Sequence, residues 1–233
     1  MTESLPIVLI PGLLCSARMY DGQIPTLWRQ GPVMVADHTR DDSMAGIAAR
    51  VLAQAPPRFA LAGLSMGGYI AFELLRQAPA RVARLALLDT QARPDTPEQS
   101  ERRRSQIALA RQGRLLEVAD QQFPLMVSVR RHGDASLRAL NQQMAADVGP
   151  EAFGRQQTAI IGRIDSRPDL AAITCPTLVL VGEHDILTPP DRAQEMAEAI
   201  GGARLVVIQD SGHLSTAEQP EAVAAALEAW LEG

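Results

Sequence analysis

The stretch Gly63–Gly67, which reads Gly-Leu-Ser-Met-Gly, constrains the fold of this chain more than any other segment. It joins the apolar run Phe59–Ala62, typical of a buried strand, to Tyr69–Arg76, whose pattern is typical of a helix. A serine between two glycines in this context predicts a turn so tight that side chains at the glycine positions would collide with neighbouring backbone. The turn is therefore expected to hold Ser65 in a strained conformation with its hydroxyl exposed.

Six short apolar runs indicate a sheet. They are continuous rather than alternating, as expected for parallel strands that are covered on both faces. The runs are Ile7–Ile10, Pro32–Ala36, Phe59–Leu64, Leu85–Asp89, Leu178–Val181 and Leu205–Ile208. Helical patterns separate most of them, at Ser43–Ala55, Gly67–Gln77, Asp191–Ile200 and Pro220–Leu231. The expected fold class is α/β, with a mostly parallel six-stranded sheet and helices on both faces.

Two further residues fit the chemistry that an exposed serine needs. A serine hydroxyl is a poor nucleophile unless a base takes its proton and an acid orients that base. His213 closely follows the expected strand Leu205–Ile208, and Asp185 follows Leu178–Val181. The chain order Ser65, Asp185, His213 matches the order of nucleophile, acid and base in enzymes with this type of turn. We therefore predict that these three residues are catalytic.

Each of these three residues could instead have a purely structural role. Ser65 could cap a helix, Asp185 could cap the helix that follows it, and His213 could be an ordinary loop histidine. Glu183 and Asp210 are the nearest rivals of Asp185 as the acid. Of the other histidines near expected strands, His38 and His184 are interpreted as packing or solvated residues. Cys15 is interpreted as a small buried side chain that could also border the pocket.

Taken together, these segments resemble the α/β-hydrolase family over essentially the whole chain. The resemblance rests on Ile10–Leu13, the Gly63–Gly67 turn, Cys175–Asp185 and Gly212–His213. Within the family, the chain looks most like small capped serine hydrolases of the 3-oxoadipate enol-lactonase and carboxylesterase group. The resemblance implies that Ser65 is the nucleophile, that His213 is the general base and then acid, and that Asp185 holds the histidine tautomer.

The resemblance also implies an oxyanion hole made by the backbone N–H groups of Leu13 and Met66. A helix beginning at Met66 would favour negative charge developing at its N-terminus. Many relatives carry a His-Gly pair where this chain has Pro11-Gly12, so we expect a changed loop orientation with the Leu13 amide still available. Only six residues precede the first apolar run, so the antiparallel N-terminal hairpin of many relatives is expected to be reduced or absent.

The chain between the fourth and fifth expected strands is longer than one crossover helix needs. Its helix candidates are Arg102–Arg111, Leu115–Phe123, Ser136–Ala146 and Ala152–Ile161. Such an insertion would sit over the carboxyl edge of the sheet, where open α/β folds bind ligands. We expect an α/β-hydrolase core of residues 1–91 and 171–233 and a helical cap of residues 92–170. The resemblance implies that the cap shapes substrate choice and excludes water; an appendage without a role in the pocket is the alternative.

The expected cap is richer in positive charge than the rest of the chain. It has 12 arginines and 10 acidic residues, whereas the whole chain has a net charge of −5. Its densest positive stretches are Arg102–Arg104 and Arg130–Arg131. The simpler interpretation is solvated helix faces. The sharper hypothesis is that one arginine reaches inward and pairs with a substrate carboxylate.

Composition excludes several other kinds of function. All 22 basic residues are arginine, so Schiff-base chemistry through a lysine of this chain is impossible. Two cysteines 160 positions apart give no metal-ligand spacing, and no Gly-rich phosphate loop is present, so neither a metal nor a cofactor is expected. The negative charge and 3% aromatic content argue against nucleic acid. Without a membrane span or signal peptide, a cytoplasmic location is expected.

The sequence thus predicts a serine hydrolase that cleaves a small carboxylic ester or lactone through an acyl-enzyme at Ser65. The same three residues would also support acyl transfer, or C–C hydrolysis or elimination. A more remote alternative is a ligand receptor on the same fold with little turnover. Haloalkane dehalogenases and epoxide hydrolases carry an aspartate at the position of Ser65, which argues against both. The sequence leaves the oligomeric state open.

Overall fold

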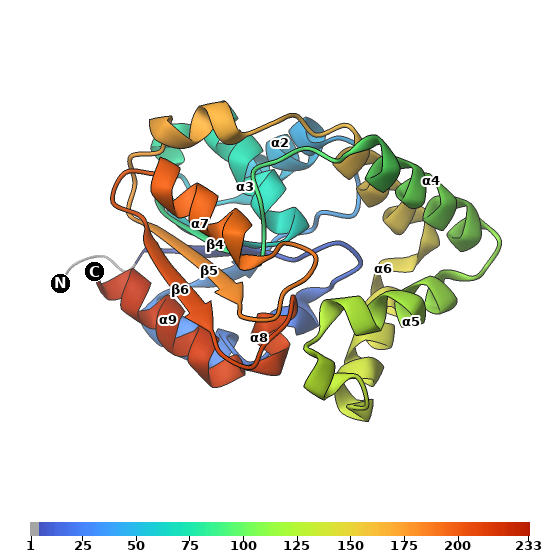
Figure 1. Ribbon diagram of the computed structural model, residues 1–233. Coiled ribbons are helices and arrows are strands. Elements are labelled where there is room, and N and C mark those ends of the chain that lie inside the picture. The colour runs from blue at the N-terminus through green and yellow to red at the C-terminus, as the bar shows by residue number, and fades with distance from the viewer. Residues whose placement is uncertain (1–4) are drawn as a thin grey trace.

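The computed structural model describes residues 5–233 and has at its centre a six-stranded sheet in which all neighbouring strands are parallel (Figure 1). The strands are β1 (Ile7–Ile10), β2 (Val33–Val35), β3 (Phe59–Leu64), β4 (Val82–Leu88), β5 (Thr177–Gly182) and β6 (Arg204–Ile208). Their order across the sheet is β2-β1-β3-β4-β5-β6. The predicted fold class is confirmed, and no antiparallel strand within residues 5–233 joins the sheet.

Both faces of the sheet are buried, which explains the continuous apolar runs. Successive side chains of a strand point to opposite faces, so Ile7 and Leu9 pack on one side and Val8 and Ile10 on the other. Helices α2 (Met44–Gln54), α3 (Met66–Gln77) and α7 (Pro190–Ala199) cover one face. Helices α1 (Ile24–Gln30), α8 (Ser215–Glu218) and α9 (Pro220–Glu232) cover the other, with four short 3-10 turns between elements: η1 (Ala17–Tyr20), η2 (Pro79–Arg81), η3 (Val129–Arg131) and η4 (Arg167–Ala172).

Three further helices follow β4 and pack against one another at one side of the sheet (Figure 1). They are α4 (Pro97–Arg111), α5 (Leu115–Met126) and α6 (Ala135–Ile161), together called the α4–α6 segment. Helix α4 begins five residues before its predicted start because Thr96 and Gln99 form a reciprocal capping box. Helix α6 joins the two predicted helices across a kink at Gly149, whose φ of 77° and ψ of 166° are not helical.

No helix within the described residues combines the length and the apolar character that a membrane crossing requires.

Candidate active site

Ser65 occupies the turn between β3 and α3, at the carboxyl end of a strand in the middle of the sheet. Its φ of 52° and ψ of −111° are strained for a residue with a side chain. A Cβ added at Gly63 would lie 2.3 Å from the Gly67 carbonyl oxygen, and one at Gly67 would lie 2.1 Å from the Ile10 carbonyl oxygen. The turn therefore closes only because both positions lack side chains.

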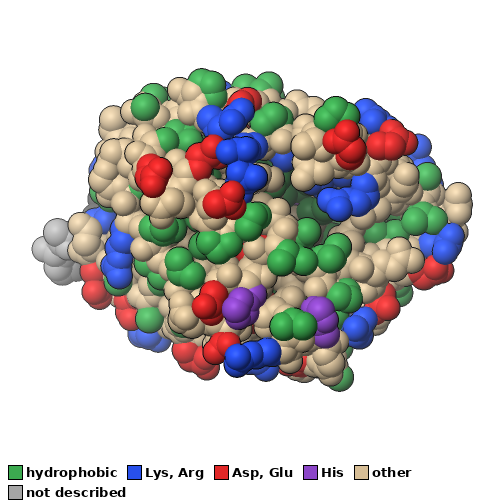
Figure 2. Space-filling view, in the orientation of Figure 1, with side chains coloured by type: hydrophobic (Ala, Val, Ile, Leu, Met, Phe, Trp, Pro, Cys, Tyr) green, Lys and Arg blue, Asp and Glu red, His purple; other side chains and the backbone are tan. Residues whose placement is uncertain are grey.

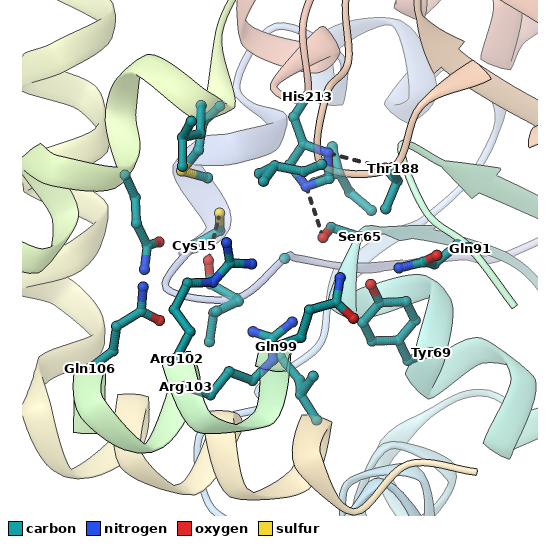
Figure 3. A pocket seen from close by; sticks show the side chains of 18 residues that line it. Cys15, Ser65, Tyr69, Gln91, Gln99, Arg102, Arg103, Gln106, Thr188 and His213 are labelled. Atoms are coloured by element: carbon teal, nitrogen blue, oxygen red, sulfur yellow. Dashed lines mark hydrogen bonds between the residues drawn. The ribbon is translucent and has the colours of Figure 1, made fainter. Parts of the chain in front are cut away.

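The structure brings Ser65, His213 and Asp185 together at the carboxyl edge of the sheet. His213 Nε2 lies 2.9 Å from Ser65 Oγ (Figure 3), and His213 Nδ1 lies 2.8 Å from Asp185 Oδ2. Asp185 and His213 are buried, while Ser65 borders the pocket. A hydroxyl, an imidazole and a carboxylate joined in this order can transfer the hydroxyl proton to the imidazole and stabilise the resulting charge.

The surroundings of Asp185 keep its carboxylate charged. Its Oδ1 accepts the Leu187 and Thr188 amides at 2.8 and 3.0 Å, and its Oδ2 accepts the Thr188 hydroxyl at 2.7 Å. Burial alone would raise the pKa of Asp185, but the charge of His213 and these hydrogen bonds hold it below its usual range. Burial opposes charge on His213 too, yet the Asp185 carboxylate raises the pKa of His213 above its ordinary value of 6.5.

The two rival acids lie elsewhere. Glu183 and Asp210 are exposed, and Glu183 Oε2 accepts the Asp210 amide at 3.1 Å. With His184 they place potential metal-ligand atoms within 4.8 Å of one another, but all three side chains are exposed. Arg130 pairs with Asp210 at 3.0 Å, as expected of a solvated arginine. Neither rival contacts His213 through a hydrogen bond within the described chain.

A further buried acid, Asp89, stands at the end of β4 and was not among the sequence candidates. Its carboxylate accepts the Gly182 amide at 2.8 Å and the Ser215 hydroxyl at 2.5 Å. Burial, together with the nearby charge of Asp185, raises the pKa of Asp89 to about 8. Asp89 thus ties the end of β5 to the first residue of α8, two positions after His213, a link that depends on tertiary packing and leaves no sequence motif.

The amides of Leu13 and Met66, named in the sequence analysis, are both available beside Ser65. Leu13 lines the pocket with Ser65, and Met66 is the first residue of α3. Within residues 5–233, neither N–H donates to a backbone carbonyl outside the helices and strands. The Met66 N–H also has no acceptor inside α3, because the first N–H groups of a helix have no intrahelical partner. Neither N–H group therefore has a backbone acceptor that would compete with a ligand.

Helix α6 holds the loop that carries Leu13. The next residue, Leu14, has a φ of 60°, and its N–H donates to Gln156 Oε1 at 3.1 Å. His38 Nε2 lies 2.9 Å from the Gly12 carbonyl oxygen and 3.0 Å from Gln156 Nε2. His38, expected to be structural, and Gln156, absent from the sequence candidates, are both buried against this loop.

The pocket above Ser65 is lined by the core and by the α4–α6 segment (Figure 3). Besides Ser65, Tyr69, Thr188 and His213, the polar lining residues are Gln91, Gln99, Arg102, Arg103, Gln106 and Gln122; none of the 18 lining residues is Asp or Glu. Cys15 is buried and also lines the pocket, so both interpretations of it hold. Its thiol donates to the Leu13 carbonyl at 3.3 Å, and burial raises the pKa of Cys15 to about 12, so it stays protonated.

The arginine-rich stretches divide between solvent and pocket. On the face in Figure 2, basic and acidic side chains are interspersed over the α4–α6 segment. Arg104 forms an exposed pair with Glu101, and Arg131 forms a half-buried pair with Asp134, each at 3.2 Å. Arg102 and Arg103 instead line the pocket.

Comparisons with known proteins identify the family of this chain. The family described as "alpha/beta hydrolase fold" matches residues 25–220. A thermophilic esterase from Thermogutta terrifontis, solved with malate bound, has 32% identity and a TM-score of 0.90, covering 99% of this chain and 90% of its own. The enol-lactonase of Burkholderia xenovorans LB400 has 26% identity and a TM-score of 0.89, covering 99% and 92%. A pimeloyl-[acyl-carrier protein] methyl ester esterase from Nitrosomonas europaea is 26% identical over 92% of this chain and 91% of its own.

The family match spans most of the chain, and the all-parallel sheet and the strained turn at Ser65 agree with it. The chain therefore belongs to the α/β-hydrolase fold family, and it is a hydrolase whose relatives include esterases and a lactonase.

Proposed function

We propose that this protein is a serine hydrolase that cleaves a carboxylic ester or lactone of a small acyl compound. The observation that carries the proposal is the hydrogen-bonded series Ser65–His213–Asp185, with distances of 2.9 and 2.8 Å, at one wall of a pocket. Such a series makes a hydroxyl nucleophilic at neutral pH, because the imidazole accepts its proton and the carboxylate stabilises the imidazolium.

The first half of the proposed cycle forms an acyl-enzyme. His213 Nε2 takes the proton of Ser65 Oγ while Oγ forms a bond to the substrate carbonyl carbon. The carbonyl electron pair moves to its oxygen, which the N–H groups of Leu13 and Met66 stabilise. When the carbon–oxygen double bond re-forms, the alcohol oxygen leaves and takes the proton from His213. In a lactone this leaving hydroxyl stays attached to the acyl group.

The second half releases the acid. His213 takes a proton from water, and the resulting hydroxide attacks the acyl carbon of the ester formed with Ser65. The tetrahedral intermediate again places its charge on the oxygen near Leu13 and Met66. Its collapse breaks the bond to Ser65 Oγ, which recovers the proton from His213.

We also propose that residues 92–170 act as the cap of this site. Helices α4 and α5 supply lining residues on the side of the pocket that faces Ser65, among them Gln106 and Met126. A wall made by helices outside the sheet can change substrate choice without altering the strand ends that hold Ser65, Asp185 and His213.

The test is steady-state hydrolysis of short p-nitrophenyl esters and small lactones by the wild type and by Ser65→Ala. We expect Ser65→Ala to lower kcat by at least about 10⁴-fold, because the nucleophile is gone. Ser43→Ala is the matched control: it also removes a serine hydroxyl, but Ser43 caps α2 and lies outside the pocket. Wild-type rates in Ser65→Ala, or no hydrolysis of any ester or lactone by the wild type, would overturn the proposal.

A further inference from the structure

Helix α4 turns one polar face toward the pocket. Gln99, Arg102, Arg103 and Gln106 all line it, at the helical spacing i, i+3, i+4 and i+7 that places residues on one face. Figure 3 shows these side chains extending into the cavity that contains Ser65 and His213. An apolar substrate would displace water from these side chains without replacing its hydrogen bonds, so the face favours a ligand that carries acceptor atoms.

Arg103 lines the pocket, but its guanidinium already has hydrogen-bond partners within the protein. Its Nε lies 2.6 Å from Asp95 Oδ2, its Nη2 lies 3.3 Å from Asp95 Oδ1, and its Nη1 donates to Gln157 Oε1 at 2.8 Å. Arg163 also pairs with Asp95 at 2.7 Å. The charge of Arg103 is therefore already paired with the Asp95 carboxylate, and three of its five N–H groups are engaged within the protein.

The same network determines which atoms the two glutamines present. Because Gln157 Oε1 accepts from Arg103, its Nε2 donates, and the acceptor at 2.8 Å is Gln106 Oε1. Gln99 Oε1 likewise accepts the Thr96 backbone N–H at 2.9 Å. Each of these oxygens already accepts one hydrogen bond, whereas neither side-chain NH2 group has a protein acceptor within residues 5–233, so Gln99 and Gln106 have N–H donors free for a ligand.

Arg102 is the remaining charge on this face. Its side chain is exposed, and within residues 5–233 it forms no ion pair or hydrogen bond with protein, whereas its neighbours Arg103 and Arg104 pair with Asp95 and Glu101. No carboxylate lines the pocket to balance it. One unpaired guanidinium flanked by two amide donors matches a single negative charge.

We propose that the natural substrate carries a free carboxylate besides its scissile ester or lactone, and that Arg102 binds this carboxylate with the amide groups of Gln99 and Gln106. The proposal rests on the hydrolase function proposed above. A carboxylate accepts two parallel hydrogen bonds from a guanidinium, which would orient the substrate as well as hold it. Arg102 is then a specificity-determining residue of the pocket.

The kinetic test uses matched pairs of p-nitrophenyl esters of equal carbon chain length. One member of each pair is the mono-ester of succinate, glutarate or adipate, and the other is the neutral ester of butyrate, valerate or hexanoate. For at least one length, the wild type should have the higher kcat/KM on the carboxylate member. Arg102→Gln should lower that value about 10- to 100-fold, mostly through KM, since a hydrogen bond to a charged group is lost. The neutral esters should stay within about twofold, because they do not use this charge.

Two variants make the result specific. Arg111→Gln removes the same charge from the same helix, about 13 Å along it and outside the pocket, and should leave both kinds of ester unchanged. Arg102→Lys should restore part of the preference, because it returns the charge without the planar pair of donors. Equal changes for charged and neutral esters in Arg102→Gln, or no preference in the wild type at any length, would overturn the proposal.

A binding measurement separates this proposal from the hydrolase function. Monomethyl glutarate is titrated into Ser65→Ala protein by calorimetry, with and without Arg102→Gln. Weaker binding in the double variant supports the carboxylate site even if no ester is hydrolysed, and equal binding overturns it. Failure of Ser65→Ala to reduce ester hydrolysis would instead overturn the hydrolase function alone.

Discussion

The sheet and its covering helices differ from the α4–α6 segment in how they hold their side chains. Eight of the 12 residues of α3 are buried, whereas only Ala110 is buried among the 15 residues of α4. The sheet packs apolar side chains on both faces, while α4 is held largely by ion pairs and amide hydrogen bonds, such as Arg103–Asp95 and Gln157–Gln106. The proposed reacting groups therefore sit on the part with buried apolar packing, and the proposed specificity residues on the part held by polar contacts.

The two regions meet at the loop that carries Leu13. The side chain of Leu14 packs in a small apolar cluster with Leu115 and Phe153 of the α4–α6 segment. Its N–H is bound by Gln156 of the same segment, while Gly12 packs against Leu64 of β3. The α4–α6 segment therefore contacts both the pocket and the loop that carries an amide proposed to stabilise the transition state.

The largest expected effect concerns the sheet region. Asp185→Asn should lower kcat by about 10⁴-fold, because the amide cannot stabilise the imidazolium and favours the wrong tautomer of His213. The measurement is single-turnover and steady-state ester hydrolysis, with Glu183→Gln as the control because Glu183 is exposed. A larger loss in Glu183→Gln than in Asp185→Asn would move the acid to position 183.

The same variant makes a prediction about pH. His213 must be neutral to act as a base, so activity should fall as pH drops through its pKa, which lies above 6.5 in the wild type. Asp185→Asn removes a carboxylate that raises this pKa, so the acidic limb of kcat/KM should move to lower pH. An unchanged limb would show that another group titrates.

A smaller effect is expected where the two regions meet. Gln156→Leu leaves the Leu14 N–H without its acceptor, so the loop should lose its position and kcat should fall about 10- to 100-fold. Gln157→Leu is the neighbouring control, because Gln157 contacts Arg103 and Gln106 and not the loop. It should change KM for carboxylate-bearing esters more than kcat. If both variants changed mainly kcat, or both mainly KM, the proposed separation of catalysis and specificity between the two regions would be wrong.

The smallest effect concerns α4 alone. Thr96→Ala removes the hydroxyl that accepts a hydrogen bond from the Gln99 backbone N–H, and it should cost about 1 kcal/mol of local helix stability. Hydrogen exchange should then be faster in the first turns of α4 and unchanged in α3, with turnover of neutral esters within about twofold of wild type. Faster exchange throughout the sheet would mean that the two regions unfold as one unit.

The sequence predicts the sheet region better than the α4–α6 segment for a physical reason. Each strand is a local apolar run, and Ser65, Asp185 and His213 each follow such a run, so topology alone brings them to one edge. Helix α1, by contrast, was not predicted: it has seven residues, no side-chain cap and one fully buried residue, Leu27. Its pattern is too short to distinguish from a loop.

The polar contacts of the pocket could not be predicted in the same way. Gln156 and Gln157 are buried, but on the sequence they look like the solvated face of a helix, because their partners come from elements 50 or more positions away. The capping box at Thr96 and Gln99 is different. Its spacing is visible in the sequence and would have given the correct start of α4.

The bend in α6 has a consequence for chemical synthesis of this protein. At Gly149 a Cβ would meet nothing within 4 Å, so the position has room for a side chain, and its backbone angles are the mirror image of an ordinary extended residue. An L-alanine would fit the space but strain the chain, whereas a D-alanine would adopt these backbone angles without that strain. The backbone at this position therefore requires a particular chirality rather than a small volume. A semisynthetic protein with a D-residue there should keep the bend, and its unfolded chain should have lower conformational entropy.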